Sequence, residues 1–153
     1  IRKATPEDSQ TIFDLIYKLA VYEKLENDVI TSVEELRTNI FEKKFAEVLI
    51  AEEDEKPVGF ALYFHNFSTF VGKPGIYLED LFVEPETRGK GYGKALLVEL
   101  ARIAKERNCG RLEWSVLDWN TPSIEFYKSL GAKPMDEWTV FRLNKEGIEN
   151  LAK

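Results

Sequence analysis

The sequence predicts an α/β or α+β fold, a single domain whose mostly antiparallel central sheet is flanked by helices. Three strand patterns with short connections follow one another in the middle of the chain, which is typical of an antiparallel meander. Amphipathic helix patterns precede and follow this meander. A strand–helix–strand unit in the second half implies a right-handed crossover and local parallel pairing.

The composition bounds the class of protein. A chain of 153 residues with 44% apolar and 31% charged residues fits one domain, residues 1–153, with a buried core. No apolar run approaches the roughly 18 residues of a membrane span, and residues 1–10 lack the apolar stretch of a signal peptide. The single cysteine, Cys109, excludes an intrachain disulfide and favours a reducing compartment. We therefore expect a cytoplasmic protein without a membrane partner.

Charge and metal-ligating residues narrow the possible partners. The net charge of −6 disfavours nucleic acid, because phosphate binding needs a basic surface, and it weakly suits a cationic ligand. The only histidine, His65, has no second ligand at a suitable spacing, so no metal is expected. Cys109 lies far from His65 in the sequence, which favours a small buried residue over a catalytic cysteine.

The first half of the chain begins with a short strand pattern over residues 1–4 and continues with two helix patterns. Thr5 is a typical N-cap, and apolar residues then recur at helical spacing as far as Leu19. Ser32 and Glu35 form a capping-box pattern that opens the second helix. The three strands of the meander are expected at residues 46–53, 57–67 and 75–83.

The second half alternates helix and strand patterns. Residues 94–108 have one apolar face, which indicates a helix. Residues 111–117 predict a strand, and a helix pattern that opens after Asn120 ends at Gly131. Residues 138–143, WTVFRL, predict a late strand.

The most informative segment is RGKGYGKAL, residues 88–96, which joins a strand to an amphipathic helix. Its glycines let the backbone approach a ligand, and the N–H groups and dipole of the helix start favour a phosphate or pyrophosphate there. An ordinary tight turn is the alternative interpretation. The segment does not match the P-loop motif, which needs Ser or Thr at the place of Ala95. It does not match the Rossmann fingerprint either.

Residues 88–93, RGKGYG, match the Q/R-x-x-G-x-G/A signature of the GNAT N-acetyltransferases, with Arg88, Gly91 and Gly93 in the defining places. The order of the expected elements agrees with that fold. The segments LEDLFV, VLDWN and PSIEFYKSLGA, which begin at positions 78, 116 and 122, resemble the diamine (spermidine/spermine) and thialysine N-acetyltransferases. The similarity covers nearly the whole chain.

This resemblance implies a GNAT domain that uses acetyl-CoA as its co-substrate, works as a homodimer and needs no metal. The pyrophosphate would be held by backbone N–H groups of residues 89–94, and the pantetheine arm would pair like an extra strand with residues 81–83. A bulge would splay the sheet there. The implied coenzyme contacts are Leu81, Phe82, Val83, Arg88, Gly89, Lys90, Gly91, Tyr92, Gly93, Lys94, Asn120 and Ser123.

Glu79 and Asp80 interrupt an apolar strand pattern. Successive strand residues face opposite sides, so one carboxylate should point toward the core side unless a bulge intervenes. From the residues alone, a solvated acid next to a salt-bridged acid is as good an interpretation as a functional pair. The resemblance implies that Glu79 accepts the proton of the substrate amine through water and that Asp80 attracts the cation.

Four further residues receive roles from the resemblance. Tyr127 would be the general acid that returns a proton to the coenzyme sulfur, although by itself it reads as a packed aromatic. Tyr22 and Glu23 match a pair that contacts the amine, and Glu23 could equally be a solvated acid. Trp138 aligns with a tryptophan near the substrate.

The predicted activity is direct transfer of an acetyl group from acetyl-CoA to a primary amine of a small diamine, polyamine, thialysine or lysine-like substrate. Ser68 and Phe70 stand where the polyamine enzymes carry an acid and a tryptophan, which favours a short amine over spermine. A protein or peptide N-acetyltransferase is one alternative. A non-catalytic acyl-CoA-binding module is another, since a fold alone does not fix function.

Overall fold

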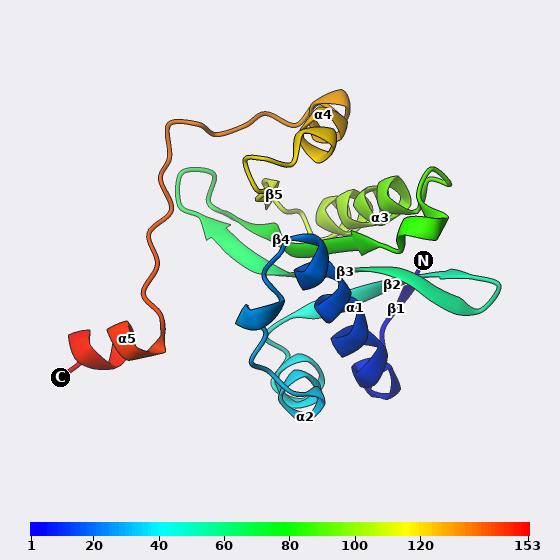
Figure 1. Cartoon of the computed structure of the whole chain (residues 1–153). Helices are drawn as coiled ribbons and strands as arrows, with labels where there is room; N and C mark the ends of the chain where they lie inside the picture. The colour runs from blue at the N-terminus through cyan, green and yellow to red at the C-terminus, as the bar shows by residue number, and fades with distance from the viewer. The chain divides into compact units, whose positions relative to one another are not determined.

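The computed structural model describes residues 1–153 and divides into two compact units, residues 1–115 and residues 116–153 (Figure 1). The strands all lie in the first unit and are β1 (Arg2–Lys3), β2 (Glu47–Glu53), β3 (Lys56–Ser68), β4 (Lys73–Val83) and β5 (Leu112–Trp114). The helices of that unit are α1 (Ser9–Tyr22), α2 (Val33–Arg37) and α3 (Tyr92–Glu106), with short helical turns η1 (Pro6–Asp8), η2 (Glu26–Asp28), η3 (Thr38–Glu42) and η4 (Pro85–Thr87). The second unit contains α4 (Thr121–Ser129) and α5 (Lys145–Leu151).

The five strands form one mixed sheet with the order β1-β2-β3-β4-β5. The first four strands pair antiparallel, which confirms the predicted meander. Strands β4 and β5 are joined through α3 and pair parallel, which confirms the predicted strand–helix–strand unit. Figure 1 shows β3 and β4 side by side as a long hairpin in the middle of the first unit.

The core of the first unit lies on both faces of this sheet. On one face, Ile12 and Leu19 of α1 pack with Phe60 of β3 and Phe82 of β4. Because side chains alternate along a strand, the residues next to Phe60 face the other side, where α3 contacts β2, β3 and β4. The buried side of α3 consists of Leu96, Leu97, Leu100, Ile103 and Ala104. None of the helices combines the length and the apolar character that crossing a membrane requires.

The start of the first helical region depends on an ion pair. Arg2 of β1 donates two hydrogen bonds of 2.8 Å to the Asp8 carboxylate, and these hold the pKa of Asp8 down at about 2. The same carboxylate accepts a hydrogen bond of 2.7 Å from the Thr5 N–H. At α2, the Ser32 side chain accepts from the Glu35 N–H at 3.1 Å, as the capping-box pattern predicts.

The second unit departs from the sequence prediction. Residues 138–143 form no strand, so the predicted late strand is wrong. A strand needs a neighbouring strand for its backbone hydrogen bonds, and residues 116–153 contain none. Strand β5 is also shorter than the predicted 111–117. Helix α5, which no pattern had indicated, begins after Asn144, whose side chain accepts a hydrogen bond of 2.9 Å from the Gly147 N–H.

Candidate active site

Strand β4 contains a bulge at Glu79. Asp80 lies opposite Leu62 of β3 and Leu78 lies opposite Tyr63, so Glu79 has no partner in the register. Asp80 thereby shares the face of Leu62, which packs against the α1 side of the core. The bulge therefore breaks the alternation that would separate the two carboxylates, and it leaves Glu79 exposed while Asp80 is half-buried.

A third carboxylate completes this cluster from another element. Glu23 is the C-cap residue of α1. Burial raises the pKa of Asp80 to about 7, and the charges of Glu79 and Glu23 add to the rise. Burial also raises the pKa of Glu23, with the charge of Glu79 contributing. The three acids therefore lie close enough to repel one another.

No cation neutralises the cluster. The salt bridges of the protein involve other acids, and Glu23, Glu79 and Asp80 take part in none of them. No group of three or more His, Cys, Asp and Glu side chains is arranged so that it could hold a metal ion. A partly shielded set of like charges without a salt-bridge partner is typical of a binding site for an organic cation.

Arg88 stacks on two aromatic rings, one from α1 and one from β4. The guanidinium carbon of Arg88 lies 5.0 Å from the centre of the Tyr22 ring and 5.7 Å from that of Phe82, so the cation stacks on both rings. Its Nε atom donates a hydrogen bond of 3.0 Å to the carbonyl of Val83. Arg88 thus connects the end of α1 with the last residues of β4.

The edge of β4 beyond the bulge is open. Strand β5 pairs with β4 only at residues 76–78 and ends at Trp114. Residues 81–83 are therefore paired with β3 but have no partner on the side of β5. A free strand edge offers N–H and C=O groups to an extended ligand, which is the geometry predicted for the pantetheine arm.

The glycine-rich turn forms an open cradle at the start of α3. Gly89 and Gly91 have φ angles of 85° and 88°, and a Cβ atom at either position would meet nothing within 4 Å. Gly91 is the N-cap residue of α3, and no side chain caps this helix start. Its first N–H groups are therefore available to an anion, and the helix dipole favours negative charge there.

Sequence reasoning missed Glu53, which lies beside this cradle. Lys90 Nζ lies 3.1 Å from both carboxylate oxygens of Glu53, and the Tyr92 hydroxyl donates to the same carboxylate at 2.9 Å. Glu53 ends β2 and lies 37 residues before Lys90. No local pattern could reveal the contact, because only the folded sheet brings these residues together.

The remaining predicted site residues belong to the second unit. Asn120 is buried and caps α4, where its side chain accepts from the Ser123 N–H at 3.4 Å. Tyr127 is half-buried on α4, with its ring centre 5.7 Å from that of Phe126. Trp138 lies in the segment without regular structure and is 74% exposed. These four residues are placed within their own unit.

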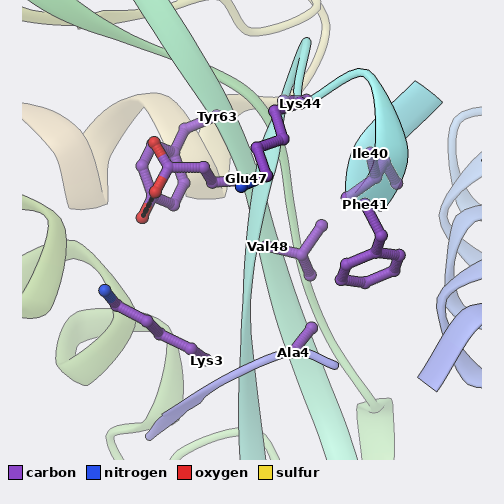
Figure 2. Close-up of a pocket in the computed structure, with 9 residues that line it drawn as sticks. Lys3, Ala4, Ile40, Phe41, Lys44, Glu47, Val48 and Tyr63 are labelled. Carbon is purple, nitrogen blue, oxygen red and sulfur yellow. Dashed lines mark hydrogen bonds between the residues drawn. The ribbon is translucent and has the colours of Figure 1, made fainter. Parts of the chain in front are cut away.

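A hollow lies elsewhere, at the β1–β2 edge of the sheet. It encloses about 480 Å³ and includes neither the cradle nor the carboxylate cluster. Figure 2 shows Glu47 and Tyr63 together on one side of the strands, with Ile40 and Phe41 on the other. Arg107 donates hydrogen bonds of 2.7 and 2.9 Å to Glu47, so the charge of this half-buried carboxylate is already paired. This hollow is therefore a structural feature rather than the candidate site.

His65 belongs to the same structural network. Its Nε2 atom lies 2.9 Å from an Arg107 nitrogen and its Nδ1 atom lies 3.0 Å from the Gly75 carbonyl. Since arginine can only donate and a carbonyl can only accept, the ring accepts at Nε2 and donates at Nδ1. The histidine thus has two protein partners and no ligand-binding geometry.

Comparison with known proteins identifies the class to which this site belongs. The profile of the Acetyltransferase (GNAT) family matches residues 13–132. A thialysine N-epsilon-acetyltransferase from Bos taurus is 40% identical, with 99% of this chain and 96% of the relative aligned. An L-ornithine N5-acetyltransferase from Arabidopsis thaliana is 29% identical, with 100% and 87% aligned. A solved integron cassette protein from the mobile metagenome of V. cholerae is 31% identical with a TM-score of 0.83, over 99% of this chain and 96% of that one.

The chain belongs to the Acetyltransferase (GNAT) family, since the family profile spans most of its length. It is an acetyl-CoA-dependent N-acetyltransferase, as the sequence predicts. The mixed sheet flanked by helices is likewise the fold of its solved relative.

Replacing Asp80 by Asn should stabilise the protein at high pH. The folded pKa of Asp80, about 7, lies above its ordinary value of 3.8, so its contribution to stability falls as the pH rises between these values. We expect Asp80→Asn to raise the free energy of unfolding by about 4 kcal/mol at pH 8 and by almost nothing near pH 4. Urea unfolding at both pH values measures the difference.

Asp14→Asn is the matched control, because Asp14 is an exposed residue of α1. It should change the free energy of unfolding by less than about 0.5 kcal/mol at either pH. A gain from Asp80→Asn that is equal at pH 4 and pH 8 would contradict the assigned ionisation.

Proposed function

We propose that the protein transfers the acetyl group of acetyl-CoA directly to a terminal primary amine of a short diamine or of a lysine-like amino acid such as thialysine. The observation that carries this proposal is the unpaired carboxylate cluster of Glu23, Glu79 and Asp80 at the bulge of β4. Such a cluster attracts an ammonium ion. Polyamines such as spermidine share the terminal amine and are the less favoured substrates.

The coenzyme would bind where β4 leads into α3. Its pyrophosphate would accept hydrogen bonds from the N–H groups of residues 89–94, because the cradle is open and the helix start is uncapped. Tyr92 would contribute its backbone there. Lys90 and Lys94 add positive charge, although Lys90 is partly neutralised by Glu53.

The pantetheine arm would lie along residues 81–83. The free edge of β4 supports this placement. The Val83 carbonyl now accepts a hydrogen bond from Arg88, so coenzyme binding would share or replace that contact. Asn120 and Ser123 of the second unit complete the proposed coenzyme contacts.

Two side chains would handle protons. An alkylammonium has a pKa of about 10 and must lose a proton before its nitrogen can attack. We assign Glu79 to receive this ammonium and to take up its proton through water, because Glu79 is exposed at the bulge. Tyr127 would return a proton to the departing thiolate. Transfer would be direct, because the one thiol, Cys109, is half-buried between α3 and β5.

The preference for a short amine rests on residues and on relatives. Tyr22, Glu23, Asp80 and Trp138 are the proposed substrate contacts besides Glu79. The relatives from Bos taurus and Arabidopsis thaliana are named for thialysine and L-ornithine, amino acids that end in a primary amine. Ser68, the last residue of β3, stands in place of an acid that a long polycation would use, and the exposed Phe70 stands in place of a tryptophan.

The domain and assembly are also proposals. The family profile, residues 13–132, crosses the boundary between the two units, which supports one acetyltransferase domain over residues 1–153. A cytoplasmic homodimer is the proposed assembly. The side chains of Val140 and Phe141 are 81% and 91% exposed, and a second copy would cover such apolar groups.

An amine panel tests the proposed activity. Thiol release from acetyl-CoA should be fastest with thialysine, lysine and short diamines, with kcat/KM at least about tenfold above that for spermine. Free coenzyme release without any amine is the blank. A strong preference for spermine, or activity on peptides and on no free amine, would contradict the proposal.

Gly91→Val should weaken coenzyme binding without unfolding the protein. A branched side chain at a φ of 88° strains the turn, so the Kd for CoA should rise at least about tenfold in calorimetry. Gly72→Val is the matched control, because Gly72 has a φ of 74° and equally open surroundings in the β3–β4 turn. Equal losses of CoA affinity in the two variants would argue against a coenzyme cradle.

Tyr127→Phe should lower kcat by about 100-fold or more, because the thiolate then lacks its acid. The Kd for CoA should stay unchanged, since the phenol hydroxyl is not assigned to coenzyme binding. Tyr17→Phe, at an exposed tyrosine of α1, serves as the control. Unchanged turnover in Tyr127→Phe would remove this residue from the reaction.

A further inference from the structure

The two adjacent acids of the bulge differ in their surroundings. Glu79 is the unopposed residue of the bulge and is exposed, whereas Asp80 is half-buried on the face of the sheet that α1 covers. A cation that arrives from solvent therefore meets Glu79 first. Asp80 is less accessible to water than Glu79.

We propose that Asp80 is the final acceptor of the proton that the substrate ammonium loses, while Glu79 binds the ammonium. This inference rests on the proposed function and deepens it, because it assigns the final protonated carboxyl group to Asp80 rather than to Glu79. The geometry carries it: one exposed and one shielded carboxylate stand side by side, with no cation paired to either.

The proton balance of the reaction is then complete. One N–H bond of the ammonium breaks and an O–H bond forms on Asp80, directly or through one water. The neutral amine attacks the acetyl carbon, the C–S bond breaks, and the second amine proton reaches the thiolate through Tyr127. The products are the amide and free CoA, and Asp80 releases its proton to solvent before the next turnover.

The charges around Asp80 suit this role. Glu79 from the same strand and Glu23 from the end of α1 are the charged groups that act on it, and both are acids. Together with burial they raise the pKa of Asp80 to about 7. Proton transfer from an amine of pKa about 10 is then unfavourable by about 10³, against about 10⁶ for an ordinary solvated carboxylate. The same acids that attract the substrate ammonium thus also raise the pKa of Asp80 and make it a better proton acceptor.

The decisive experiment compares pH–rate profiles of the wild type, Asp80→Asn and Glu79→Gln. With saturating acetyl-CoA and thialysine as the amine, kcat of the wild type should rise with an apparent pKa near 7. Asp80→Asn should lower kcat at pH 8 by about 10² to 10⁴-fold and abolish this rise. Glu79→Gln should keep the rise but displace it to lower pH, because one of the charges that hold the proton on Asp80 is lost.

A direct titration keeps the test independent of turnover. The carboxyl ¹³C resonance of Asp80 in aspartate-labelled protein, assigned by its absence in Asp80→Asn, should titrate with a midpoint near 7 in the wild type and at lower pH in Glu79→Gln. A midpoint near the ordinary value of 3.8 would overturn the inference. Circular dichroism confirms that each variant is folded.

The outcomes separate this inference from the proposed function. A wild type that releases thiol with thialysine while Asp80→Asn keeps the rise near pH 7 overturns the role of Asp80 alone. A higher KM in Asp80→Asn with an unchanged kcat profile also overturns it, since Asp80 would then only attract the cation. A wild type inactive with every amine overturns both.

Discussion

The one-residue bulge at Glu79 is the constraint on which the site depends. The bulge adds one residue to β4 relative to β3. Leu78 lies opposite Tyr63, whereas Asp80, two residues further on, lies opposite Leu62, the immediate neighbour of Tyr63. The pairing with β5 ends at Leu78, just before the bulge, and the edge of residues 81–83 has no strand partner on that side. Within a few residues β4 therefore presents both an acidic cluster and an unpaired backbone edge, where the chain leads toward the glycine-rich cradle.

The surrounding core holds this arrangement against electrostatic repulsion. Glu23 reaches the cluster because α1 is anchored by Leu15 and Leu19 against Phe60 and Phe82 of the sheet. Burying a large apolar side chain stabilises the fold by about 2 kcal/mol, so a few such contacts offset the cost of three neighbouring carboxylates. The apolar packing of α1 thus matters for the proposed site, because it holds Glu23 close to Glu79 and Asp80.

Local patterns predicted the parts of the fold that local physics determines. The glycine cradle, the amphipathic helix α3 and the capping of α2 by Ser32 were all visible in short stretches of sequence. The acids at the bulge were visible only as an interruption of a strand, and which of the two is shielded depends on the register with β3. The contact of Glu53 with Lys90 arises between distant segments and left no local signal. Residues 138–143 show the opposite failure, since their alternation predicts a strand but cannot supply the neighbour that a strand requires.

The acidity of the site bears on product release as well as on substrate capture. In the proposed site, three carboxylates would attract the ammonium group of the substrate, and acetylation would convert that group into a neutral amide and remove the attraction. With Asp80 as the acceptor, the proton left behind also reduces the negative charge of the cluster at the moment the amide forms. Both changes weaken the same electrostatic interaction, so the acetylated end of the substrate is held less strongly than the ammonium group was. A basic or neutral pocket would lack this difference between the binding of the ammonium substrate and that of the amide product. The difference follows from the position of exposed and shielded acids next to one another at the bulge of β4.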